Sequence, residues 1–205
     1  MEIKKIVYKK GRYSLYFSPE ERPPLSLKED VFVRHNLYKG KEISLEDLEK
    51  IQDQSQVQEA IDFVLPKLRA KKTVFQVQDL LSREGFSDSA IARALAYLKT
   101  YQFLDDRDYV ASFIHDKRRF NHYGKLKLFY LLRQKGVSED LIQEGLEDIT
   151  EEMEYDLALS LGKKRIHHYD LETFKGRGKF LRYLYGKGFA KDLALRVLES
   201  LNHDE

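Results

Sequence analysis

The sequence predicts a mainly helical protein: three tandem three-helix repeats in an elongated, curved array, preceded by a small N-terminal α/β module. Three glycines carry this prediction. Gly85, Gly136 and Gly188 are spaced by 51 and 52 residues, and an apolar residue follows each of them. Glycine at the end of a helical pattern is typical of a left-handed C-terminal turn. We therefore expect these three glycines to be structural residues that join two helices in every repeat.

The apolar residues around the glycines recur at matching offsets. Positions eight, five and four residues before each glycine are apolar in all three copies, as one face of a helix requires. Offsets of 6, 10 and 13 after each glycine are apolar as well: Ile91, Leu95, Leu98; Ile142, Leu146, Ile149; Ala194, Leu198, Leu201. A unit of about fifty residues buries little surface alone, so stacking on its neighbours is expected to complete its core.

A further helix is predicted before each pair. The first spans about residues 57–69, with Pro66 bending it; the second opens at Leu104-Asp105-Asp106; the third spans about 154–166. Asp105 and Asp106 are interpreted as structural acids that cap a helix rather than as metal ligands. The third copy has five extra residues in the loop before its second helix.

The first fifty residues have a different pattern. Tyr13, Leu15 and Phe17 alternate with polar or exposed-type residues, which predicts a β-hairpin. Ser26 and Ser44 each precede an acid by three residues and predict the starts of two short helices. The predicted domains are 1–52 for this module and 53–105, 106–152 and 153–205 for the three helical repeats.

Composition excludes several classes of protein. The chain has no cysteine, which excludes disulfides, thiolate catalysis and cysteine zinc sites. It has no apolar run near 18 residues, so we expect a cytoplasmic protein without a membrane span. A formal charge of +2 does not by itself indicate a nucleic-acid partner.

No catalytic constellation is visible. Gly176-Arg177-Gly178-Lys179 lacks the glycine spacing of a phosphate-binding loop, and no predicted strand precedes it. The histidines form no HExxH pair. We therefore expect no enzymatic activity, no cofactor, no metal and no small-molecule substrate.

Charge is strongly segregated along the repeats. Residues 117–135 contain seven Lys or Arg and no acid, 139–156 contain nine acids and no Lys or Arg, and 163–187 contain eight basic residues against two acids. Basic runs interleaved with aromatics favour an anionic polymer or an acidic protein groove as partner, although several of these aromatics also occupy core positions of the repeat. The candidate partner-binding or DNA-binding residues are Arg69, Lys71, Lys72, Lys117, Arg118, Arg119, Lys125, Lys127, Arg133, Lys163, Lys164, Arg165, Arg177, Lys179 and Arg182.

The chain resembles the RecX family of recombination regulators from about residue 57 to 201. The middle copy carries the most specific stretch: Leu104-Asp105-Asp106, Tyr109, Ala111, Ile114, Arg118, Gly124, Leu131-Leu132 and Gly136-Val137. The N-terminal module resembles the extension of Gram-positive members. The sequence departs from many members at Gln76 and Pro66, both in the first copy.

The resemblance implies a protein that lies in the groove of the RecA nucleoprotein filament and restrains strand exchange and ATP turnover. It also implies a secondary contact with the enclosed DNA. The residues themselves leave two alternatives open. One is a helical DNA-binding protein that acts independently of RecA, and the other is a scaffold that packs on unrelated proteins.

Overall fold

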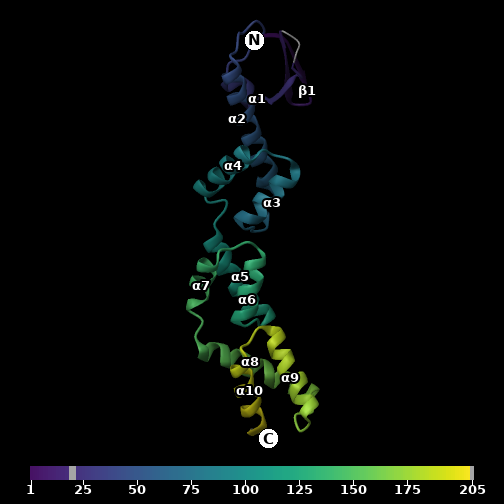
Figure 1. Cartoon of the computed structure of the whole chain (residues 1–205), viewed down its shortest axis with the longest axis vertical. Coiled ribbons are helices and arrows are strands. Elements are labelled where there is room, and N and C mark those ends of the chain that lie inside the picture. The colour runs from purple at the N-terminus through teal and green to yellow at the C-terminus, as the bar shows by residue number, and fades with distance from the viewer. Residues whose placement is uncertain (19–21, 204–205) are drawn as a thin grey trace. The chain divides into compact units, whose positions relative to one another are not determined.

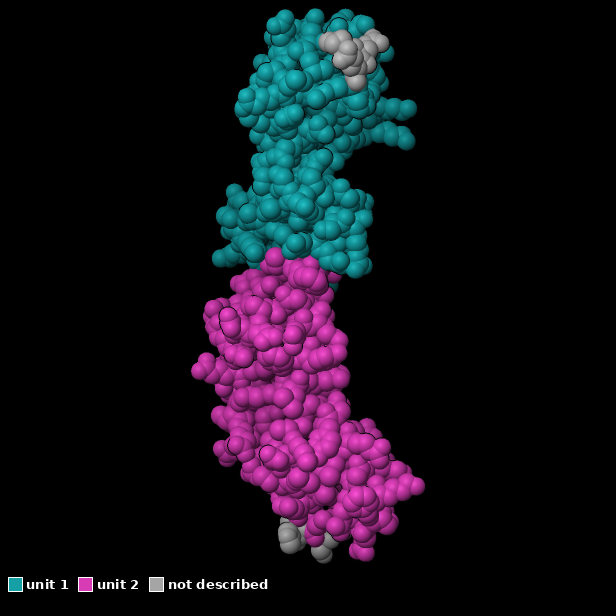
Figure 2. All heavy atoms as spheres, viewed as in Figure 1, with its two compact units in different colours: residues 1–71, 77–104 teal, residues 72–76, 105–205 magenta. Residues whose placement is uncertain are grey.

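The computed structural model describes residues 1–18 and 22–203 and divides into two compact units (Figure 2). Unit 1 contains residues 1–71 and 77–104, and unit 2 contains residues 72–76 and 105–205. Within the described residues, no helix combines the length and the apolar character that a membrane span needs.

Unit 1 joins a small sheet to the first helices of the array (Figure 1). The sheet is antiparallel in the order β1-β2-β3, with bounds Glu2–Lys9, Arg12–Ser18 and Leu25–Lys28. Ile3, Leu15 and Leu27 are fully buried on its inner face. The helices of this unit are α1 (Glu29–Arg34), α2 (Leu45–Val64), the 3-10 helix η1 (Leu65–Arg69), α3 (Val74–Glu84) and α4 (Asp88–Thr100).

Three predictions for this region are wrong in detail. The hairpin has a third strand, and Ser26 lies in that strand, so it does not cap α1; the residue at the cap position is Lys28. The two helices predicted around residues 45–51 and 57–69 are one helix, α2, which Ser44 caps. Pro66 does not bend that helix, because α2 ends before it and Pro66 lies in η1, where a missing N–H is tolerated.

Unit 2 holds the second and third helical repeats, together with the first residues of α3. Their helices are α5 (Asp106–Asn121), α6 (Lys125–Gln134), α7 (Glu139–Glu147), α8 (Glu151–Arg165), the 3-10 helix η2 (Ile166–His168), α9 (Phe174–Lys187) and α10 (Lys191–His203). Each repeat has its own core: Leu128, Leu132 and Ile142 are completely buried in one, and Phe180 and Leu184 in the other.

The three glycines have the backbone conformation that the spacing predicts. Gly85, Gly136 and Gly188 have φ angles of +91°, +74° and +93°. In each turn, the N–H of the following apolar residue donates to the carbonyl four residues before the glycine: Phe86 to Leu81, Val137 to Leu132, and Phe189 to Leu184. These bonds satisfy helix C-terminal carbonyls that would otherwise lack partners.

The repeats of unit 2 stack by placing the start of one helix on the glycine turn of the next repeat. Gly124 N–H donates to Lys187 O at 2.9 Å, and Leu126 N–H donates to Gly188 O at 3.2 Å. A Cβ on Gly124 would lie 2.5 Å from Gly188 O, closer than side chains allow. Free amides at the start of α6 thereby meet free carbonyls at the end of α9, with the two helix dipoles in a favourable order.

The same arrangement occurs between the start of α3 and the end of α6. Thr73 Oγ1 donates to Lys135 O at 2.7 Å, and the ring of Phe75 covers Gly136. Thr73 and Gln76 also form the predicted capping box, because the Gln76 N–H donates to Thr73 Oγ1 and the Thr73 N–H donates to Gln76 Oε1. A side chain at Gly136 would collide with the Phe75 ring, so both this contact and the positive φ angle require glycine at this position.

An acid from the next repeat completes each junction. Asp106 Oδ1 accepts the Val74 N–H at 2.9 Å, and Glu154 Oε2 accepts the Lys125 N–H at 3.0 Å. Both acids lie in the first turn of the first helix of a repeat. Asp105 has a different task, since its side chain accepts the N–H groups of Arg107 and Asp108 and caps its own helix.

In the third repeat, the loop before α9 takes the place that a neighbouring repeat takes at the start of α6. Gly176 aligns with Thr73 and Gly124 in the repeat. However, α9 begins two residues before Gly176, at Phe174, and is capped by Thr173. A Cβ on Gly176 would collide with Asp170 O, as one on Gly124 would with Gly188 O. The extra loop residues therefore place a carbonyl where a further repeat would place its glycine turn.

Two glycines at the end of α9, Gly186 in its last turn and Gly188 just after it, predict opposite effects of the same substitution. Gly188→Ala is expected to destabilise unit 2 by about 3 kcal/mol, because the new Cβ meets a strained φ and the backbone of Lys127. Gly186→Ala, two residues earlier and in open space, is expected to stabilise it by about 0.5–1 kcal/mol. Urea unfolding measures the free energy of unfolding of both variants. Equal changes in the two variants would show that the stacked turn contributes nothing to stability.

Glu154→Gln is expected to weaken the junction strongly. The Glu154 carboxylate pairs with Arg118 and accepts the Lys125 N–H, and the two side chains are only 7% and 16% exposed. Removing the carboxylate charge leaves the Arg118 guanidinium without its partner in a site that little water reaches. This lowers the free energy of unfolding by about 3 kcal/mol. Glu152→Gln, an exposed neighbour, is expected to stay within about 0.5 kcal/mol of wild type. Hydrogen exchange at the start of α6 gives a local readout of the same effect.

Candidate partner-binding surface

Cations gather around an aromatic ring where α5 and α6 end. Lys117 Nζ and Lys135 Nζ each lie 5.7 Å from the centroid of the Phe113 ring. Phe113 is half-buried and packs on the core of the second repeat. We call Lys117, Lys135 and Phe113 the Phe113 cluster. Two positive charges on one apolar ring form a site for an anionic group beside an apolar surface.

The third repeat has a related cluster where α8 and α9 end. Arg165 lies 5.7 Å from the Tyr183 ring centroid, and Lys187 Nζ lies 5.9 Å from Tyr183 and 5.5 Å from Tyr123. Lys187 also donates to Asn121 O at 2.9 Å, which fixes its side chain across the junction. We call Tyr123, Arg165, Tyr183 and Lys187 the Tyr183 cluster. Lys135 and Lys187 both precede the glycine of their repeats, so the two clusters are equivalent in part.

Burial raises the pKa of the Tyr183 hydroxyl above its usual value, and the charge and hydrogen bond of Arg165 lower it in part. Tyr183 is therefore a neutral hydroxyl at physiological pH. It adds a polar group to the Tyr183 cluster without any negative charge, which keeps the cluster fully cationic.

Several predicted basic residues have structural contacts instead. Arg118 is held by Glu154 inside the junction. Arg133 pairs with Glu139 at 3.3 Å, Arg182 Nε donates to Gly178 O at 3.3 Å, and Lys127 packs on Gly188. Lys125 contributes its backbone N–H to Glu154. Arg118, Lys125 and Lys127 therefore contribute to the junction, whereas Arg133 and Arg182 make exposed contacts within their own repeats.

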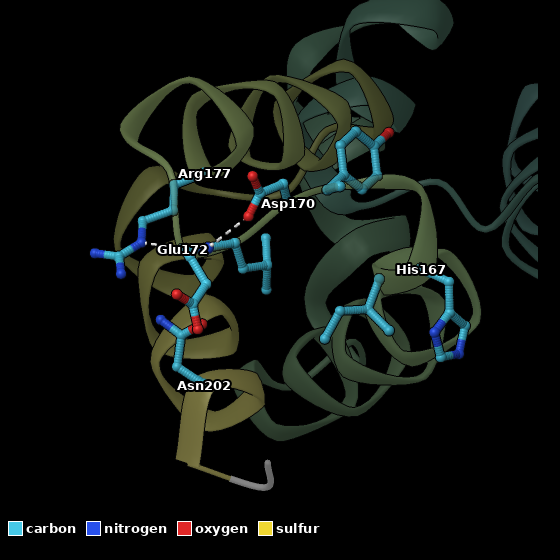
Figure 3. A pocket seen from close by; sticks show the side chains of 8 residues that line it. His167, Asp170, Glu172, Arg177 and Asn202 are labelled. Atoms are coloured by element: carbon cyan, nitrogen blue, oxygen red, sulfur yellow. Dashed lines mark hydrogen bonds between the residues drawn. The ribbon is translucent and has the colours of Figure 1, made fainter.

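Arg177 lies in a polar pocket of about 480 Å³ beside the extra loop of the third repeat (Figure 3). Its Nε donates to Leu171 O at 2.5 Å, and Glu172 N–H donates to Asp170 Oδ1 at 3.2 Å. Figure 3 shows the Arg177 guanidinium turned outward from the loop rather than toward His167. The bond to Leu171 helps to hold the loop that covers the start of α9.

The remaining candidates are exposed, apart from the half-buried Lys72. Arg119 lies over the Phe120 ring at 5.3 Å, and Lys163, Lys164 and Lys179 line the surfaces of α8 and α9. Arg69, Lys71 and Lys72 follow η1, with the first two in unit 1 and Lys72 in unit 2.

Sequence reasoning missed four residues that matter here. Lys135 and Lys187 share a sequence signal that identifies them, because each lies one residue before the glycine of its turn. Phe113 has no sequence signal that separates it from a core residue. Glu154 lies in the first turn of its helix, as Asp106 does, but Asp106 is the first residue of α5 and Glu154 is the fourth residue of α8, which conceals the match.

Comparison with known proteins follows the repeat structure. The second three-helix domain of RecX matches residues 105–146, and its third three-helix domain matches residues 151–198. Two crystal structures share the fold. One, of a regulatory protein RecX, covers 97% of this chain with a TM-score of 0.71 and 24% identity. The other, RecX from Lactobacillus salivarius, covers 72% with a TM-score of 0.65 and 18% identity.

Three regulatory RecX proteins illustrate the similarity in sequence. That of Streptococcus sanguinis is 32% identical over 210 residues, which cover the whole of this chain and 79% of that protein. That of Bacillus licheniformis is 30% identical over 190 residues, which cover 90% and 71%. That of Clostridium botulinum strain Alaska E43 is 39% identical over 140 residues, and the match spans 65% of its length. The chain belongs to the RecX family.

Proposed function

We propose that this chain is a regulatory protein that binds RecA in its nucleoprotein filament and lowers recombinase and ATPase activity. It acts by binding and has no catalytic step of its own. Its relatives carry the name regulatory protein RecX, and the structure offers stacked repeats with charged surfaces.

The observation that carries the proposal is the recurrence of a cationic aromatic cluster from one repeat to the next. The Phe113 cluster and the Tyr183 cluster each combine two cations with a half-buried ring. A partner that is itself a polymer of identical subunits presents the same acidic feature at regular intervals. Two weak contacts on one rigid unit then add as avidity rather than as independent affinities.

Neutralising one cluster tests the proposal. Lys117→Gln with Lys135→Gln is expected to raise the concentration for half-inhibition of the single-strand-dependent ATPase of the cognate RecA by about tenfold, or roughly 1.4 kcal/mol. Arg165→Gln is expected to act in the same direction. Lys50→Gln is the control, because Lys50 is exposed on α2 and forms an exposed ion pair with Glu46 of the same helix. Wild-type protein without inhibitory effect at near-stoichiometric amounts would contradict the proposal.

The second candidate function is DNA binding independent of RecA, which the same cations favour. The salt dependence of DNA affinity distinguishes it from RecA binding. If the Phe113 cluster contacts phosphates, the double variant lowers the slope of log K against log salt on bare DNA by about 2, roughly one for each lysine. If the cluster contacts RecA, that slope stays unchanged while filament inhibition is lost. DNA affinity measured at several salt concentrations distinguishes the two.

A further inference from the structure

A groove of about 590 Å³ lies in unit 2 between α5 and the connection from α7 to α8. Its position is separate from both cationic clusters. Among the residues that line it are Ala111, Ile114, Arg119, Asp148, Ile149 and Met153.

The floor of the groove is apolar. Ile114 and Ile149 are 7% and 5% exposed and belong to the core of the second repeat. Met153 stands at the edge with 49% of its surface exposed, in the first turn of α8. Methionine is flexible and polarisable, and it adapts to apolar side chains of different shapes. A phosphate chain gains nothing from such a floor.

The two walls carry opposite charge. On the α5 side, His115 and Arg119 are exposed, and the neighbouring Arg118 is neutralised by Glu154. On the other side, Asp148 follows the end of α7, beside the acidic first turn of α8. A nucleic acid in the groove would face these acids. A protein segment can match the basic wall and the apolar floor together, because it can direct a carboxylate toward α5 while an apolar side chain enters the floor.

We propose that this groove binds a protein segment that pairs an apolar side chain with a neighbouring carboxylate, the carboxylate facing Arg119. The inference deepens the proposed function and rests on it for the identity of the partner. It assigns protein contact to the groove between α5 and α8, and leaves any DNA contact to other surfaces of unit 2.

Filling or reversing the groove tests this directly. Ala111 is an exposed alanine on α5, so Ala111→Trp fills the groove without disturbing the core. Arg119→Glu reverses the basic wall. Both are expected to lower affinity for the cognate RecA filament at least tenfold and to leave affinity for bare single-stranded DNA within twofold. Ala96→Trp, an exposed alanine on α4, is the matched control and is expected to bind like wild type. Unchanged filament binding, or an equal loss on bare DNA, would overturn the proposal.

A second readout does not depend on the filament. The chain has two methionines, Met1 and Met153, so methyl labelling gives one signal in the groove and one internal reference. A short peptide of alternating Phe and Asp is expected to shift the Met153 signal saturably. It should leave Met1 unchanged and give no saturable shift in Ala111→Trp. The same peptide with Lys for Asp should bind at least several-fold more weakly.

The outcomes separate the two claims. A wild-type protein that fails to inhibit RecA while Met153 responds to the acidic peptide rejects the proposed function and keeps the groove. A protein that inhibits RecA while Met153 responds to neither the acidic peptide nor the filament rejects the groove. A Met153 shift with a DNA oligonucleotide alone shows a nucleic-acid site and also rejects it.

Discussion

The junction between repeats depends on one interaction: the unpaired amides at the start of a helix meet the unpaired carbonyls at a glycine turn. The amides of Gly124 and Leu126 donate to the carbonyls of Lys187 and Gly188, and at the start of α3 the Thr73 hydroxyl donates to the Lys135 carbonyl in the same way. Each of these groups would be costly to bury alone, so the pairing explains how repeats with small separate cores stack. It also explains why an acid recurs in the first turn of the following repeat. Asp106 and Glu154 accept helix-start amides that the glycine turn does not pair. Specificity comes from the fit, because a side chain at Gly124, Gly136 or Gly188 would collide with the neighbouring repeat.

The junction also lies beside the surface that we propose for partner binding. In the Tyr183 cluster, Arg165 and Lys187 lie at the ends of α8 and α9, and in the Phe113 cluster, Lys117 of α5 and Lys135 at the end of α6 share one ring. Lys187 shows the link most directly, because it precedes the glycine turn, donates to Asn121 across the junction and lies over two tyrosine rings. The groove that Met153 borders arises at the same junction, on α5 and α8. Structural and binding residues are therefore neighbours, and Arg118, which looks like a binding residue in the sequence, belongs to the structural group.

Much of the fold followed from the sequence because periodic burial leaves a direct trace. Most of the apolar positions around Gly85, Gly136 and Gly188 are buried, since a helix face must repeat to fill each core, and the position five residues before each glycine is half-buried. The third strand was missed because Leu25–Lys28 is too short to show alternation. The single helix α2 was predicted as two because the polar run Gln52–Gln56 interrupts its apolar pattern. The three boundaries between the four predicted domains stay a prediction. For the site, charge runs located the basic surface but could not separate Arg118 from Lys117, because the partner of Arg118 lies 36 residues away. Tertiary pairs of that kind leave no local signal.

The most direct measurement of this account is a cryo-electron microscopy map of the protein on the cognate RecA–single-stranded DNA filament. The account predicts that unit 2 keeps its stacked junction in the complex, that the Phe113 and Tyr183 clusters face acidic surfaces related by the repeat of the filament, and that the groove at Met153 holds a RecA segment. A map in which unit 2 leaves the filament untouched, or in which both clusters face solvent, would contradict it.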